Sequence, residues 1–226
     1  MNTDKKQALS VHLKAIRRML IVSVASVAVL FVLFFYLLCG PLVDFVLAPV
    51  RARGIEVITT SVSEALMMQF KVCLIAAVIA GMPVIIWQGW VFVAPALYPQ
   101  EKRLFAALFF VALLLFVGGV AFCYCLVFPM AIDLFWSAAD GVASTLWSVK
   151  EYFNFVLSFV LPFGLMFELP VVVYMLARRG LVTYQKLAHS RKYVILVIAI
   201  IAAILTPPDA VSQCMLAIPM ILLYEV

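Results

Sequence analysis

The chain has 226 residues, of which 67% are hydrophobic and only 12% are charged, and its formal net charge is +5. A soluble globular domain carries about 25% charged residues, so this composition excludes that class. The mean hydropathy of +1.20 indicates a membrane protein. The basic residues lie in short clusters beside apolar runs, which argues against a nucleic-acid partner.

The first predicted span covers about residues 18–38 and follows a basic segment. Five of the 16 Lys and Arg residues lie within residues 4–18. Basic segments beside membrane spans tend to stay in the cytoplasm, so the N-terminus is expected there. An external loop with the turn signals "CGP", "LAP" and "RARG" is predicted to follow, up to Glu64.

Spans two and three are predicted at about residues 66–93 and 104–128. Each is long enough to cross about 30 Å of hydrocarbon as a helix. The turn "APALYPQEKR" joins them, and its basic residues predict a cytoplasmic position. The segments predicted to be external hold few basic residues, namely Arg51, Arg53, Lys71 and Lys150.

A fourth span is predicted at about residues 152–177, and the basic loop "RRGLVTYQKLAHSRK" after it indicates another cytoplasmic turn. The last two apolar segments, residues 193–205 and 210–226, are separated only by "TPPD". As helices they reach roughly 20–23 Å, short of the hydrocarbon thickness. Either the bilayer thins around this hairpin, or the last helix continues beyond residue 226. The ending "LLYEV" has no basic tail and favours a truncated last helix.

These segments together predict an all-α polytopic membrane protein with six transmembrane helices. It is expected to form a single transmembrane domain over residues 1–226, with both termini in the cytoplasm. Prolines lie inside three of the helices, where each removes a backbone hydrogen bond and bends the helix. Bent helices favour a curved, open arrangement. The prolines are Pro83, Pro162, Pro170 and Pro219.

Several stretches, in chain order, resemble the TatC family. They are "VHLKAIRRML" near the N-terminus, "LAP" at residues 47–49, "MPVIIWQGWVFVAPALYPQEKR" at 82–103, "FELPV" at 167–171 and "LTPPDAVSQCMLAIPM" at 205–220. The Pro-Pro-Asp and Ala-Pro-x-Leu-Tyr-x-x-Glu patterns are specific to this family. The resemblance covers nearly the whole chain.

The resemblance implies a concave, glove-like protein of the bacterial cytoplasmic (inner) membrane. It implies the signal-recognising core subunit of the twin-arginine, Sec-independent translocase, which exports folded proteins using the proton-motive force. The implied partners are twin-arginine signal peptides, small single-span subunits of the TatA/TatB type, membrane lipid and further copies of the chain. No enzyme activity, cofactor or metal is implied, and the five cysteines lack metal-ligand spacing.

Recognition of two adjacent arginines calls for carboxylates, because guanidinium groups pair with them bidentately. Acids are few in the segments predicted to be cytoplasmic, and Glu101 is the strongest candidate; the resemblance implies signal-peptide binding at this position. The alternative is a solvated loop acid offset by its basic neighbours, with the N-terminal motif residues as interfacial anchors. The resemblance implies that further residues bind the signal peptide together with Glu101, namely His12, Arg17, Pro49, Phe92, Lys102 and Arg103.

The N-terminal motif departs from the family pattern His-Leu-x-Glu-Leu-Arg. It reads "HLKAIR", with Ala15 at the position of the Glu and Lys14 beside it. This removes one expected partner of the Arg pair and adds a like charge. Either recognition depends on Glu101 alone, or the sequence has been altered here.

The apolar stretch "FGLMFELPVVVYML" contains one charged residue, Glu168. A carboxylate inside a bilayer is costly, so such a residue usually has a function. Ten helical residues, about 15 Å, separate it from Arg178, so it is not expected to reach the interface. We expect a neutral carboxyl that donates a hydrogen bond to a partner helix. A structural hydrogen bond between helices of this chain is the alternative.

Other polar residues are candidates for the same intramembrane face. Gln88, Asn154 and Gln213 are expected to contribute to it. Asp209, in "TPPD", is expected to cap the last helix, with a direct role in transport, as part of the intramembrane polar and partner-docking set, as the alternative.

Two other function classes would use Glu168 differently. An intramembrane enzyme would use it as an acid or base, but both histidines lie in segments predicted to be cytoplasmic, and no GxSG, GxGD or HExxH motif occurs. A proton-coupled secondary transporter is the stronger alternative. It requires an enclosed cavity with several convergent polar groups, and the sequence shows few.

Overall fold

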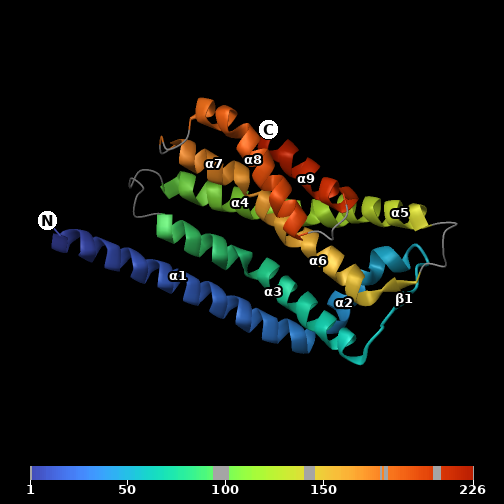
Figure 1. The fold of residues 1–226 in the computed structure, drawn as a ribbon. Coiled ribbons are helices and arrows are strands. Elements are labelled where there is room, and N and C mark those ends of the chain that lie inside the picture. Colours follow the sequence, from blue (N-terminus) through green and yellow to red (C-terminus); the bar gives the residue numbers. More distant parts are fainter. Residues whose placement is uncertain are drawn as a thin grey trace.

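A computed structural model gives the fold of the chain (Figure 1). It describes residues 2–93, 102–139, 146–178, 180, 183–205 and 210–225. Within these ranges the side chains of 2–13, 90, 92–93, 102–105, 138–139, 184, 186–187 and 205 are not described. The described chain is almost entirely helical, as the sequence predicts.

Two long helices form one side of the molecule. Helix α1 (Asn2–Leu37) and helix α3 (Val62–Val93) run side by side (Figure 1). Aromatic stacking joins them near the end of α1, where the Phe35 ring lies 4.7 Å from the Phe70 ring, centroid to centroid. Helix α2 (Cys39–Arg51), which lies between these two helices in the sequence, turns away from α1 after Leu38.

The third predicted span is a helix with a π-helical turn inside it. Helix α4 (Lys102–Phe122) continues through the π-helical segment η3 (Cys123–Val127) into α5 (Phe128–Ala139). The turn presents Tyr124 to α2: its hydroxyl donates to the Phe45 carbonyl at 2.8 Å, and the two rings stack at 4.3 Å. A single-turn π-helix of this kind inserts one extra residue into an α-helix.

The fourth predicted span is broken into two helices, α6 (Val149–Met166) and α7 (Leu169–Arg178). Pro170 has no N–H to donate, and its ring would clash with the carbonyl four residues earlier in a continuous helix. The chain therefore changes direction at residues 167–168. Glu168 N donates to the Leu165 carbonyl at 3.1 Å, and the Glu168 carbonyl starts the next helix by accepting from Val172 N at 3.1 Å.

The last two helices form a hairpin, α8 (Tyr184–Leu205) and α9 (Ala210–Glu225). Helix α8 begins at residue 184 rather than at 193, because the basic segment before the apolar run is also helical. Helix α8 has 22 residues and is about 33 Å long, but its first nine residues are the basic segment, so the apolar run 193–205 within it stays short. Helix α9 has 16 residues and reaches about 24 Å. Arg191 and Glu225 form an ion pair at 3.2 Å across the hairpin.

A small parallel sheet lies at the end of the molecule opposite to the start of α1 (Figure 1). Strand β1 (Val57–Ile58) pairs with strand β2 (Trp147–Ser148), with Val57 opposite Trp147. The sequence analysis did not predict it. The sheet joins the segment before α3 to the segment before α6.

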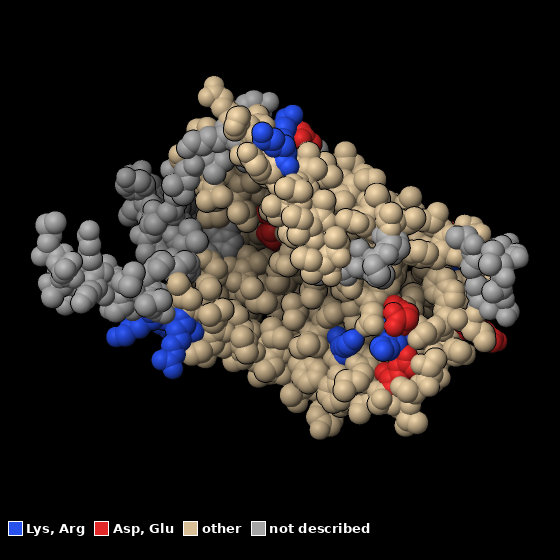
Figure 2. Space-filling model, in the orientation of Figure 1, with Lys and Arg blue, Asp and Glu red and all other residues tan. Residues whose placement is uncertain are grey.

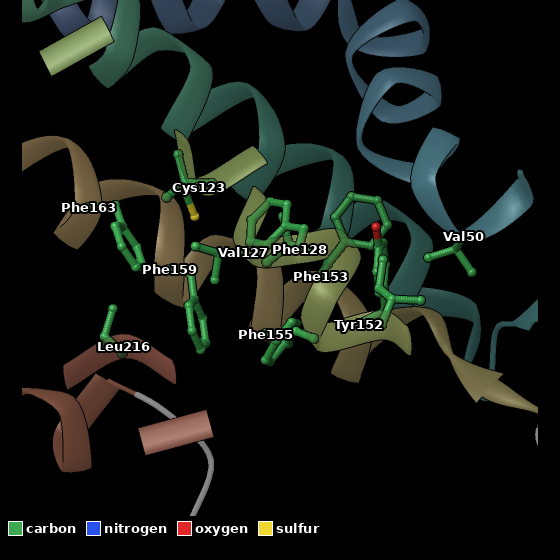
Figure 3. Packing of buried hydrophobic residues seen from close by; sticks show 14 of the residues in the cluster. Val50, Cys123, Val127, Phe128, Tyr152, Phe153, Phe155, Phe159, Phe163 and Leu216 are labelled. Atoms are coloured by element: carbon green, nitrogen blue, oxygen red, sulfur yellow. The ribbon is translucent and has the colours of Figure 1, made fainter. Parts of the chain in front are cut away.

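Helix α6 is the centre of the hydrophobic core (Figure 3). It buries residues all around its circumference, as expected for a helix enclosed by others. Phe159 and Phe163 stack on each other and point toward Leu216 of α9 (Figure 3). Close packing against α4 depends on two glycines: a Cβ at Gly119 would lie 2.7 Å from the Phe163 carbonyl oxygen, and one at Gly164 would lie 2.5 Å from the Phe116 ring.

Four segments of the described chain are long and apolar enough to cross a membrane as helices. They are Lys14–Leu37, Val62–Gly89, Ala106–Ser137 and Val149–Arg178, and α9 is a shorter apolar helix. Several membrane-spanning helices therefore make this a multi-pass membrane protein. A count of six spans and the cytoplasmic position of both termini stay predictions.

Candidate functional site

The basic end of the molecule contains most of the residues predicted to bind a signal peptide. The first turns of α1, the last turns of α3 and the first turns of α4 come to this end (Figure 1). Lys14, Arg17 and Arg18 are exposed on α1, and Figure 2 shows basic side chains on this part of the molecule. The predicted residue Glu101 lies outside the described residues.

Four further candidates are placed by their helices only. His12 lies in α1, Phe92 lies near the end of α3, and Lys102 and Arg103 begin α4. The structure brings the backbone segments of these four residues to one end of the molecule.

Pro49 is not brought to this end. It lies in α2, after the far end of α1, and Arg17 is separated from Leu37 by 20 helical residues, or about 30 Å. The Pro49 carbonyl accepts a hydrogen bond from Arg53 at 3.0 Å. Pro49 and Arg17 therefore cannot contact the same pair of adjacent residues in a ligand.

Glu168 lines an apolar groove between α3 and α7. The groove has a volume of about 380 Å³, and its other lining residues include Met82, Ile86 and Val172. Figure 2 shows a hollow on this face of the molecule with red atoms inside it. The break between α6 and α7 places Glu168 here, because its backbone ends one helix and starts the next.

One oxygen of the Glu168 carboxyl group, Oε1, is buried and has no hydrogen-bond partner within the described residues. A buried acceptor without a donor destabilises the protein by about 1–3 kcal/mol. A donor supplied by a molecule in the groove would remove that cost. The arrangement therefore suits binding of an apolar helix that carries one polar group.

The other predicted intramembrane residues that the structure describes do not line this groove with Glu168. Gln213 donates to the Ala199 carbonyl at 3.2 Å and so connects α9 to α8. Asn154 accepts from Lys71 at 2.8 Å, near the start of α6. Gln88 is partly buried on α3 but is not among the described groove-lining residues. Asp209 lies outside the described residues.

Sequence reasoning missed a polar cluster around Glu64, at the end opposite to the basic patch. Glu64 is buried, and its Oε2 accepts from the backbone N–H groups of Thr60 at 2.6 Å and Ser61 at 3.1 Å. Its Oε1 accepts from the Ser148 hydroxyl at 3.1 Å and from Lys150 N at 3.2 Å. The pattern Ser61-x-x-Glu64 at the start of α3 is a capping box, and this signal could have identified the residue.

An ion pair fastens the segment after α2 to α5. Arg53 donates to both carboxylate oxygens of Asp133, with Nη2 to Oδ2 at 3.0 Å. It also donates to the carbonyl oxygens of Pro49 and Pro129. The hydrogen bond to Asp133 raises the pKa of Arg53 above its usual value, so this guanidinium is charged at any physiological pH.

The described residues contain no group of three or more His, Cys, Asp or Glu side chains that could hold a metal ion. Cys73 and Cys123 are both buried, and Cys123 packs as a small residue in the hydrophobic core.

Comparison with known proteins gives a consistent result. The family model for "Sec-independent protein translocase protein (TatC)" matches residues 11–219. A TatC protein of Carboxydothermus hydrogenoformans is 38% identical over 224 residues, which cover 99% of this chain and 92% of that protein. A TatC protein of Haemophilus influenzae is 36% identical over 227 residues, covering 99% and 88%.

The fold is also similar to that of a solved structure. A crystal structure of a twin arginine translocase receptor, TatC, superimposes with a TM-score of 0.88 at 37% sequence identity. The superposition covers 95% of both chains.

Proposed function

The chain belongs to the TatC family of Sec-independent protein translocase proteins, and from this premise we propose that it is the signal-peptide receptor of a twin-arginine translocase. In this proposal it lies in the bacterial cytoplasmic membrane with both termini inside. It binds the Arg-Arg motif of a folded precursor protein at its basic end and docks small single-span subunits of the TatA/TatB type. Export uses the proton-motive force.

The observation that supports a binding site at the basic end is the convergence of three segments. Arg17 lies in α1, and Glu101 directly precedes α4 in the sequence. The end of α3 and the start of α4 lie near the N-terminal part of α1 (Figure 1), so we expect a peptide that reaches Glu101 to come close to α1. A carboxylate at Glu101 supplies the acceptor that a guanidinium fork requires.

Docking of a single-span partner is proposed at the Glu168 groove. Its floor is apolar, which suits the side chains of a membrane helix, and the unpaired Oε1 is ready to interact with one donor. A proton-coupled transporter using Glu168 remains the alternative function. Glu168 is the only ionisable side chain among the described residues that line the groove, so a relay would have no second group there.

The first prediction tests signal recognition. A photoreactive residue placed at position 100, beside Glu101, should crosslink to a peptide with an Arg-Arg motif and not to its Lys-Lys counterpart. Glu101→Gln should weaken peptide binding by about 1.5–3 kcal/mol, roughly 10–100-fold, because a charged hydrogen bond is lost. Ala15→Glu should strengthen binding, since it supplies a second carboxylate.

The matched control is Glu56→Gln, which removes an exposed carboxylate at the opposite end of the molecule. Binding that is equally strong in the Glu101 and Glu56 variants would place the Arg pair elsewhere.

A further inference from the structure

A polar cavity lies between the first turns of α3 and α6, opposite to the basic end of the molecule. It has a volume of about 270 Å³. Two ammonium groups, three neutral polar side chains and apolar side chains line it, among them Lys71, Lys150, Asn154, Ser61, Ser63 and Met67. Charged side chains also gather toward this end in Figure 2. The residues proposed for peptide and partner binding do not reach it.

The two ammonium groups form no ion pair within the described residues. Lys71 donates to the neutral Asn154 side chain at 2.8 Å, which uses one of its three donors. Neither Lys71 nor Lys150 takes part in the described ion pairs. Glu64 also lines the cavity, but its carboxylate already accepts hydrogen bonds from backbone and hydroxyl donors. The cavity therefore has a net positive charge with free donors.

The position of Lys71 indicates the source of a matching anion. It lies within the apolar span Val62–Gly89, seven residues and about 10 Å beyond Glu64 along α3. A lysine inside a span is costly unless its charge is compensated or reaches the membrane surface. Side chains of a helix tilt toward its N-terminus, and that of Lys71 lines the cavity together with Ser61 and Ser63 at the start of α3. Phospholipid phosphates lie beside the outermost turns of a spanning helix, so the cavity is placed to meet one.

The surface of α3 next to the cavity suits an acyl chain. Met67 lines the cavity and is exposed, Leu74 lies two turns further along and is also exposed, and Val78 lies one turn beyond. Residues at these spacings share one face of a helix. The distance from Met67 to Val78 is 11 residues, or about 16 Å, which matches the thickness of one leaflet at roughly 15 Å. Leu74 and Val78 also line an apolar groove between α1 and α3.

We propose that this cavity binds the phosphate group of an anionic membrane phospholipid. Lys71 and Lys150 hold the phosphate, the serine hydroxyls donate to it, and one acyl chain lies along the Met67, Leu74 and Val78 face of α3. Free inorganic phosphate has the same headgroup chemistry, but it would make no use of this apolar face. The lipid should therefore bind more tightly than phosphate.

Titration of the delipidated full chain with short-chain phosphatidylglycerol, followed by native mass spectrometry, tests the proposal. The unaltered protein should bind one lipid saturably. The affinity of the double variant Lys71→Gln/Lys150→Gln for this lipid should be lower by a factor of about ten or more, because charge-assisted hydrogen bonds are lost. The control variant Lys14→Gln/Lys192→Gln removes the same number of positive charges at the other end of the molecule. It should bind the lipid as tightly as the unaltered protein.

Three results would overturn the proposal. One is equal lipid affinity in the cavity variant and the unaltered protein. Another is an equal loss in both double variants, which would show non-specific attraction to positive charge. The third is inorganic phosphate binding as tightly as the lipid, which would indicate an anion site without a lipid.

A second measurement uses the unaltered protein and so does not depend on folding of the variants. The rate at which a small, neutral, amine-reactive reagent modifies each lysine is compared in nanodiscs of phosphatidylglycerol and of phosphatidylcholine. Phosphatidylglycerol should slow the reaction of Lys71 more than that of Lys14, because the headgroup covers only the former. Equal slowing of the two lysines would contradict the proposal.

Discussion

Among single residues, Glu168 gives the sharpest distinction between partner docking and proton transfer. Glu168→Gln keeps a donor and an acceptor at similar size, so it should retain export of a folded twin-arginine substrate. Glu168→Leu should insert well, because a polar group is removed from hydrocarbon, but it should lose about 1–2 kcal/mol of partner association, roughly 5–30-fold. Export assays with protein abundance checked measure both.

A proton relay predicts the opposite for the Gln variant, because an amide cannot titrate. Failure of Glu168→Gln alongside Glu168→Leu, at normal abundance, would therefore contradict docking. Val172→Leu is a suitable control in the same groove, since it changes the apolar lining and leaves the carboxyl group in place.

Glu64 is predicted to stabilise the fold. In Glu64→Gln the amide nitrogen replaces one carboxylate oxygen and faces donors such as Thr60 N and Ser61 N, so hydrogen bonds are lost and donors oppose each other. The melting temperature of the detergent-solubilised protein should fall. Glu56→Gln, on the exposed side chain nearby, should leave the melting temperature unchanged, and equal melting of the two variants would show that Glu64 contributes little.

These two acids also show how far single residues could be predicted from the sequence. Glu168 is conspicuous because it is the one charge in a long apolar stretch. Its groove was not predictable, since the groove depends on where α7 lies relative to α3. Glu64 begins an apolar run, where an acid is ordinary, and half of its partners come from a segment more than 80 residues away.

Among helices, the close contact between α4 and α6 yields a test with an adjacent control. Gly119→Ala would place a Cβ within 2.8 Å of the Phe167 ring and 2.7 Å of the Phe163 carbonyl oxygen. Overpacking of this kind should lower the free energy of unfolding by about 1–3 kcal/mol. Gly118→Ala has nothing within 4 Å of its Cβ, so only helix propensity changes there.

The measurement is the unfolding midpoint of both variants in the same detergent. Because the two sites are neighbours in α4, the propensity effect of Gly→Ala cancels in the comparison. Equal midpoints would mean that the two helices can move apart at no cost.

Hydropathy predicted where the helices lie better than it predicted their ends and bends. The apolar runs of α1, α3, α4 and α6 are evident because each must cover about 30 Å of hydrocarbon. The start of α8 was misplaced, since a charged segment can be as helical as an apolar one. The break at residues 167–168 follows from Pro170, yet Pro162 lies inside α6 without breaking it, so proline alone did not identify the site.

For the whole molecule, the orientation in the membrane is the testable property. In a chain whose five cysteines are replaced by alanine, a cysteine at Glu56 should react with a membrane-impermeant maleimide added outside intact cells. A cysteine at Gln185 should react only after the membrane is opened. Both positions are exposed in the described structure, so burial does not limit either reaction.

Labelling at position 185 from outside would exclude the arrangement with six spans and both termini in the cytoplasm. The prediction rests on the excess of basic residues in alternate segments, a property of the whole sequence that no single contact reveals.

The hydrogen bonds of Glu64 also have a consequence for the order in which the chain assembles during synthesis. Ser148 is 84 residues downstream of Glu64, so this contact cannot exist while α3 is entering the membrane. Glu64 first caps the start of α3, where its Oε2 accepts from Ser61 N. Its Oε1 stays hydrated until β2 and α6, which supply its other donors, have been synthesised. Completion of the end that contains the small sheet is therefore a late step, and a nascent chain that stalls before α6 would leave this carboxylate accessible to water.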